Sequence, residues 1–169
     1  MENFKIFTKK DNQRYQFFSS HFVAGSNASY YSVIKQMKAK DMHQVIINSE
    51  LMIQIVKKIN FASNCIENIE ITESIGTTES SIITSLLAQY KKNPTKESYD
   101  ALLASLSSFE EQESIDIRKI DLKIALQGLK YKRIVRIWSN GIYTADEKYA
   151  NKIFIDFLTP ILEEYWNEE

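Results

Sequence analysis

The sequence predicts a mixed α/β protein of the α+β class, with a mixed sheet of about six or seven strands and about five helices. Two observations lead to this prediction. Short runs in which apolar and polar residues alternate occur near both ends and in the middle of the chain, and such alternation is typical of strands. Between them lie longer stretches with apolar residues three and four positions apart, which is the spacing of a helix face.

The first elements predicted are two strands and a helix. Residues 4–8 alternate, the polar sequence KKDNQ turns the chain, and residues 14–24 form a second strand rich in aromatic side chains. Gly25 ends that strand. Residues 30–37 then carry apolar side chains at helical spacing.

The next stretch predicts a βαβ unit. Residues 45–47 are a short apolar strand, residues 51–59 have a helical apolar stripe, and residues 66–72 alternate again. Because short joints connect strand, helix and strand, we expect the two strands to be parallel with a right-handed crossover.

Two antiparallel helices are predicted after a break at Gly76 and Thr77. Residues 82–90 and 99–106 each carry a helical apolar stripe, and Pro94 separates them. We therefore expect an αα-hairpin. Residues 1–169 are expected to form a single domain, with the acidic segment 109–114 as a candidate linker and weak subdivision.

The remaining elements are two strands, a hairpin turn and a helix. The apolar alternation changes phase within residues 115–124, which indicates a β-bulge near Arg118. A strand over residues 129–138 leads to Asn140-Gly141, which favours a type I′ turn. Thr144 is expected to open a capping box for the last helix, which Pro160 kinks or restarts. The helix and strand phases predict that the following residues are buried: Leu86, Leu103, Ile124, Ile153 and Phe157.

Composition excludes some classes of function. The net charge of −1 provides no overall attraction for nucleic acid or anionic lipid. The single cysteine, Cys65, excludes an intramolecular disulfide and favours a reducing compartment, so we expect a cytoplasmic protein without a membrane-spanning segment. The abundance of Ile, Lys, Asn and Ser is typical of AT-rich genomes, such as those of low-GC bacteria, their phages and mobile elements.

One strand carries a candidate nucleic-acid or partner face. Even-numbered positions of the strand 129–138 include Lys130, Lys132, Arg136 and Trp138, and they leave the same side of a regular strand. Cations could hold phosphates while the indole stacks on a base. The alternative is a solvated sheet face with its aromatic ring packed under a helix.

A second candidate is an anion site at a helix start. Ser26, Asn27 and Ser29 place hydroxyl and amide groups beside free backbone N–H groups. The same residues are also ordinary helix caps, and no phosphate-loop glycine pattern accompanies them.

Catalytic and metal-binding patterns are weak. Asp116, Asp121 and Lys123 show a distant likeness to the acids and lysine of metal-dependent nucleases, but the spacing does not fit well. Neither His21 nor His43 has a second His or Cys at metal-ligand spacing. We therefore predict no catalytic residues, no metal and no cofactor.

These observations favour a non-enzymatic protein that binds another protein as a regulatory, inhibitory or accessory factor. Trp166, near the end of the last helix, is a candidate interface anchor because tryptophan is enriched at the centres of interfaces. The alternative is a nucleic-acid-binding module that uses the basic strand face. A third hypothesis is an enzyme whose site is assembled from residues far apart in the sequence.

Overall fold

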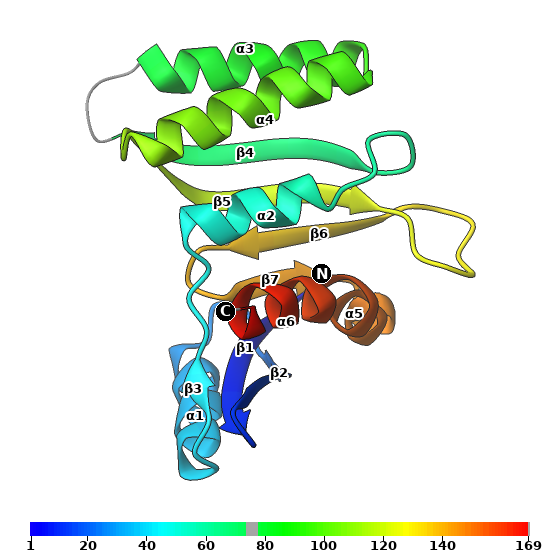
Figure 1. The fold of residues 1–169 in the computed structure, drawn as a ribbon. Coiled ribbons are helices and arrows are strands. Elements are labelled where there is room, and N and C mark those ends of the chain that lie inside the picture. Colours follow the sequence, from blue (N-terminus) through cyan, green and yellow to red (C-terminus); the bar gives the residue numbers. More distant parts are fainter. Residues whose placement is uncertain (74–77, 169) are drawn as a thin grey trace. The chain divides into compact units, whose positions relative to one another are not determined.

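The computed structural model describes residues 1–73 and 78–168, and it confirms the α+β class. The elements follow the order shown in Figure 1: β1 (Glu2–Asp11), β2 (Arg14–Phe22), α1 (Asn27–Ala39), β3 (His43–Gln44), α2 (Ser49–Lys57), β4 (Cys65–Glu73), α3 (Thr78–Lys92), α4 (Lys96–Glu111), β5 (Ile115–Ile124), β6 (Arg133–Trp138), β7 (Ile142–Ala145), α5 (Glu147–Ile153), the π-helical segment η1 (Phe154–Leu158) and α6 (Thr159–Asn167). The chain divides into two compact units. Unit 1 comprises Met1–Ile46 and Asn140–Glu169, and unit 2 comprises Ile47–Ser139.

Unit 1 is built around strand β1. Strand β2 pairs antiparallel with one side of β1 in an unbroken register from Asn3 opposite Phe22 to Asp11 opposite Arg14. The other side of β1 pairs antiparallel with β7 and with the two-residue strand β3. Helix α1 closes a small core in which Phe7, Phe22 and Val33 are buried, and α6 packs on β2. Phe17 and Phe22 of β2 are buried, although β2 is the outermost strand of the sheet.

Unit 2 contains an antiparallel sheet in the order β4-β5-β6 and three helices. Helices α3 and α4 lie antiparallel and side by side, joined by residues 93–95 (Figure 1). The apolar face of β5 includes Ile117, Ile120 and Leu122, all buried. Its register with β4 skips Arg118, which confirms the predicted bulge: Lys119 lies opposite Glu70 and Ile117 lies opposite Ile71. The extra residue shifts the alternation so that isoleucines before and after the bulge face the same core.

The prediction of a βαβ unit is wrong, and so is the prediction that its two strands are parallel within a mixed sheet. Strand β4 pairs antiparallel with β5, whereas residues 45–47 form no ladder with β4. The Val45 N–H donates to the Ile6 carbonyl at 3.1 Å within unit 1, and the Ile47 N–H donates to the Ser139 carbonyl at 2.8 Å within unit 2. Val45 and Ile47 are apolar because each is buried in its own unit, while Ile46 between them is exposed.

Three local predictions in the second half need correction. Strand β6 begins at Arg133, so residues 129–132 are not strand. Gly141 has the expected positive φ of 77°, but Asn140 does not, which rules out the type I′ turn because that turn needs both. The cap of the last helical region is Asp146, whose side chain accepts from the Lys148 N–H, and Thr144 belongs to β7. The helix begins only at Glu147, and the Thr144 hydroxyl donates to Asn3 Oδ1 at 3.0 Å instead of capping it.

Helix α6 restarts after a π-helical segment, with Pro160 in its first turn. Leu158 and Thr159 before it have helical dihedral angles, so the chain stays helical from η1 into α6. Of the residues predicted to be buried, Ile124 and Ile153 are buried, whereas Leu86, Leu103 and Phe157 are half-buried.

The acidic segment 109–114 completes α4 and turns into β5 inside unit 2, and the units divide elsewhere. The predicted break at Gly76 and Thr77 lies outside the described residues. Within residues 1–73 and 78–168, no helix combines the length and the apolar character that crossing a bilayer requires.

Candidate binding surface on the β5–β6 segment

The polar face of the unit 2 sheet is ordered by cross-strand register. Lys119 lies opposite Trp138, Asp121 opposite Arg136, and Lys123 opposite Ile134. These positions alternate with buried residues on both strands, so their side chains leave the face opposite the apolar core. Two of the predicted face residues, Arg136 and Trp138, are therefore brought together here.

The charges on this face largely neutralise one another. The Asp121 carboxylate lies 3.6 Å from the Lys119 ammonium and 4.0 Å from Arg136 Nε. The Lys119 ammonium is also 5.5 Å from the centre of the Trp138 ring, within range of a cation–π interaction. Arg136, Lys119 and the indole ring therefore already have partners in the chain.

A second acid neutralises the neighbouring cations at the edge of the sheet. The Glu67 carboxylate lies 3.4 Å from the Lys123 ammonium and 3.8 Å from that of Lys91. Burial by itself raises the pKa of Glu67, but the hydrogen bond with Cys65 and the two lysines outweigh burial and lower it. The pKa of the Cys65 thiol is raised by burial and by Glu67, so this cysteine is not activated as a nucleophile.

The other two predicted face residues, Lys130 and Lys132, lie in the loop that precedes β6. Both are exposed, and the Lys130 ammonium is 5.3 Å from the centre of the Tyr131 ring. Tyr131 itself is 63 % exposed, and Ile134, three residues further, is 40 % exposed. Among the described residues, neither lysine has an ion pair with an acidic side chain. We call Lys130, Tyr131, Lys132 and Ile134 the Tyr131 surface.

Sequence reasoning missed Tyr131 because it was placed on the core side of a strand. The sequence did offer one signal, Gly128, because glycine readily adopts the positive φ of a turn, and in the structure its φ is 82°. Exposed tyrosine beside lysine can bury its ring against a partner while the ammonium groups meet carboxylates.

The helix start proposed as an anion site is a capped helix terminus. The Ser26 hydroxyl accepts from the Ser29 N–H at 3.1 Å, and the Ser29 hydroxyl accepts from the Val23 N–H at 2.8 Å. Both hydroxyls thus satisfy backbone donors. Asn27, the first residue of α1, is exposed, so its side chain adds no buried ligand group.

Trp166 contacts residues of its own unit. Its ring meets Tyr15 and Phe17 edge-on, with centres 5.1 and 6.1 Å apart, and the residue is half-buried. This packing attaches α6 to β2.

The acidic residues do not converge as a nuclease-like metal site requires. Asp116 accepts a hydrogen bond from the Ser49 hydroxyl at 2.9 Å, while Asp121 is paired with Lys119. Throughout the described ranges, no three His, Cys, Asp or Glu side chains are placed to hold one metal ion.

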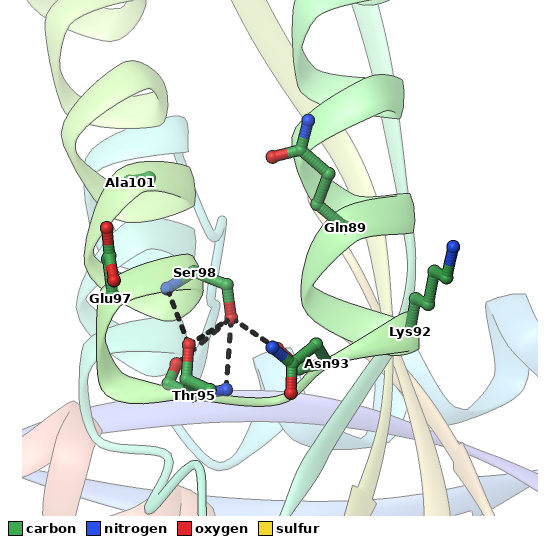
Figure 2. A pocket seen from close by; sticks show the side chains of 7 residues that line it. All are labelled: Gln89, Lys92, Asn93, Thr95, Glu97, Ser98 and Ala101. Atoms are coloured by element: carbon green, nitrogen blue, oxygen red, sulfur yellow. Dashed lines mark hydrogen bonds between the residues drawn. The ribbon is translucent and has the colours of Figure 1, made fainter.

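Each unit contains hollows of its own. A hollow of about 380 Å³ at the turn between α3 and α4 is lined by Gln89, Lys92 and Glu97 among others (Figure 2). The Thr95 and Ser98 hydroxyls beside it are bonded to each other and to the backbone, as the dashed lines in Figure 2 show, so they serve the helix cap. Another hollow, of about 430 Å³, lies between α1, β1 and β3 and is lined by Phe7, Ile34 and Met42 together with polar side chains.

Comparison with protein-family models, with curated proteins and with solved structures finds no match to this chain.

Proposed function

We propose that the protein acts by binding another protein and not by catalysis, and that the Tyr131 surface is the binding site. One observation carries this proposal: Tyr131 and Ile134 are 63 % and 40 % exposed within a few residues of each other, flanked by two lysines. Because the two residues are three positions apart, their Cα atoms lie within about 10 Å of each other. Large side chains of this kind gain most when a partner removes them from water.

The charge of the surface indicates the chemistry of the partner. The ammonium groups of Lys130 and Lys132 favour a partner that presents carboxylates around an apolar patch, because opposite charges speed and orient association. The single cysteine, Cys65, has no second cysteine in the chain with which to form a disulfide, which suits a reducing compartment, so we place this binding in the cytoplasm.

A pull-down with matched variants tests the proposal. Wild-type protein, the double variant Tyr131→Ser/Ile134→Ser and the control Tyr31→Ser/Ile155→Ser would be immobilised and exposed to lysate of a low-GC bacterium. The control is matched because Tyr31 and Ile155 are 65 % and 53 % exposed but lie in unit 1. We expect the wild type and the control to retain one partner protein in stoichiometric amounts, and the Tyr131→Ser/Ile134→Ser variant not to retain it. Equal retention by all three contradicts the assigned surface.

The nucleic-acid alternative makes a different prediction. Phosphate binding by Lys130 and Lys132 requires affinity that falls steeply with salt, because each contact releases counterions. Since Arg136 and Lys123 lie beside acids of the chain, we expect only weak retardation of DNA or RNA, equal for the wild type and for Lys130→Glu/Lys132→Glu. A tight, salt-sensitive complex that this variant loses would replace protein binding with nucleic-acid binding.

A further inference from the structure

The hydrogen bonds of β1 show which backbone groups of strand β2 point outward from the sheet. The Ile6 N–H donates to the Gly141 carbonyl at 2.9 Å, and the Ile6 carbonyl accepts from the Val45 N–H at 3.1 Å. Both groups of Ile6 therefore point away from β2. Ser19 lies opposite Ile6, and residues of a directly opposed antiparallel pair either bond each other or both point outward. The backbone groups of Ser19 thus face outward from the sheet.

Because the register is unbroken, every second residue of β2 has the same orientation. Tyr15 provides an independent check: its N–H donates to Asn167 Oδ1 at 2.8 Å, and its carbonyl accepts from Asn167 Nδ2 at 3.2 Å. The Asn167 side-chain amide pairs with the edge of β2 as a peptide group of another strand would. Phe17, Ser19 and His21 follow at alternate positions, so their N–H and C=O groups also face outward.

The edge is closed at both ends and open between them. Asn167 occupies it at Tyr15, and the Ser29 hydroxyl accepts from the Val23 N–H at 2.8 Å at the other end. Strand β2 is the first strand of its sheet, with β1 as its neighbour. No other described residue forms a ladder along the edge of residues 17–21. This stretch is called the open β2 edge.

The two outer strands, one in each unit, are protected differently. Strand β4 has a bulge of its own at Glu67, which its register with β5 skips, and it carries several acidic residues. Bulges and charges of this kind prevent unwanted pairing. Residues 17–22, with the sequence FFSSHF, contain no lysine, no proline and no register shift. A regular, uncharged edge is what a pairing strand requires.

We propose that the open β2 edge pairs with the same edge of a second copy of this chain, forming a symmetric dimer. The open stretch is centred on Ser19, so a twofold axis there places Ser19 opposite Ser19 and Phe17 opposite His21 of the second copy. The three outward residues of each copy then form about six backbone hydrogen bonds. The twofold symmetry follows from the closure at Tyr15 and Val23, which are equally distant from Ser19.

The facing side chains are compatible with this pairing. Phe17 and His21 form an aromatic cross-strand pair, which is a favourable combination. His21 Nε2 lies 2.9 Å from the Glu2 carboxylate in its own chain, so the edge carries no uncompensated charge to repel the second copy. The inference is independent of the proposed function, because the Tyr131 surface belongs to unit 2 and the open β2 edge to unit 1.

A proline variant tests the dimer with a matched control. His21→Pro removes an outward N–H and places a ring on the edge, while the ladder to β1 loses no donor. His21→Ala keeps the N–H and removes only the side chain. Sedimentation equilibrium of the full chain over a range of concentrations is expected to show a dimer for the wild type and His21→Ala, and a monomer for His21→Pro.

Hydrogen exchange provides a readout that does not depend on a variant. In the wild type, exchange of the Phe17, Ser19 and His21 amides is expected to slow as the protein concentration rises through the dimer range. The Tyr15 and Val23 amides serve as internal controls, because Asn167 and Ser29 already bind them. A wild type that stays monomeric, a His21→Pro variant that still forms the dimer, or a wild-type dimer whose Phe17, Ser19 and His21 amides stay unprotected overturns the proposal.

Discussion

At the scale of single residues, Lys5 is the least expected feature of unit 1. Its side chain is completely buried, and its ammonium group donates to the Val45 carbonyl at 3.1 Å and to the Asn140 carbonyl. Ile46 and Asn140 are the residues at which the chain leaves and re-enters unit 1. Lys5 thus binds both ends of that interruption. Burial lowers its pKa to about 8, because water no longer stabilises the charge.

This pKa predicts how stability changes with pH. In the unfolded chain Lys5 keeps its proton up to about pH 10.5, whereas in the folded chain it loses it near pH 8. The unfolded state therefore binds more protons in this window, and the free energy of unfolding rises with pH. We expect Lys5 to add about 2 kcal/mol between pH 7 and pH 9.5, calculated from the pKa difference.

Denaturant unfolding of the wild type and Lys5→Met at both pH values measures this contribution. The difference between the two proteins isolates Lys5 from Tyr99 and Tyr143, whose pKa values burial raises to about 12 and which destabilise the fold only above pH 10. Parallel pH profiles for the two proteins would contradict the prediction.

Gly141 lies against the same contacts and predicts a large cost of substitution. A Cβ atom at Gly141 would collide with the Val45 carbonyl oxygen, and the residue has a φ of 77°. Gly128 is a matched control, because its φ is 82° but nothing lies within 4 Å of a Cβ there. We expect Gly141→Ala to lower the free energy of unfolding by more than about 3 kcal/mol. Gly128→Ala is expected to cost about 1 kcal/mol from backbone strain alone.

Equal losses for the two glycine variants in a thermal or denaturant unfolding experiment would show that the contact with Val45 does not constrain the turn.

At the scale of elements, one tyrosine links α4 to α2. The Tyr99 hydroxyl donates to the Val56 carbonyl at 2.5 Å, in the last turn of α2, and the same carbonyl also accepts from the Ile59 N–H at 3.2 Å. Tyr90 on α3 has a weaker equivalent, with its hydroxyl 3.4 Å from the Asn64 carbonyl. Both rings are buried.

The two hydroxyls should therefore differ in their contribution to stability. We expect Tyr99→Phe to lower the free energy of unfolding by about 1 kcal/mol, since the Val56 carbonyl loses the shorter of its hydrogen bonds in a buried site. Tyr90→Phe is expected to change it by less than about 0.5 kcal/mol, because a 3.4 Å contact is a weak hydrogen bond. Urea titrations of both variants measure the difference, and a larger loss for Tyr90→Phe would show that helix α2 is held by other contacts.

At the scale of the whole molecule, the chain passes between the units through very short connections. Strand β6 of unit 2 ends at Trp138 and β7 of unit 1 begins at Ile142. The other crossing, at Ile46–Ile47, is followed almost at once by α2. Short connections favour cooperative unfolding of the two units, so the single domain over residues 1–169 stays a prediction.

A cooperative molecule should lose both units together. We expect calorimetry of the wild type to show one transition, and we expect Gly141→Ala in unit 1 and Tyr99→Phe in unit 2 each to lower that same transition temperature. Two transitions, each shifted by only one of the variants, would show that the units are separate domains.

The sequence predicted the features that depend on neighbouring residues. The α+β class, the positive φ of Gly141 and the bulge at Arg118 follow from local alternation and turn chemistry. The predicted basic strand face was correct only in part. Arg136 and Trp138 share a sheet face, but Lys130 and Lys132 lie in a loop. Tyr131 was missed, because an exposed tyrosine and a core tyrosine show the same pattern.

Tertiary structure decided what depends on contacts distant in sequence. A buried apolar run such as 45–47 does not specify its partner, so only the fold shows that Val45 and Ile47 enter different units. The burial of Lys5 depends on carbonyl groups about 40 and 135 residues away. The free edge of β2 depends on which strands pair elsewhere. Local periodicity reflects which residues are buried. Packing and loop closure across the whole chain determine which strands pair.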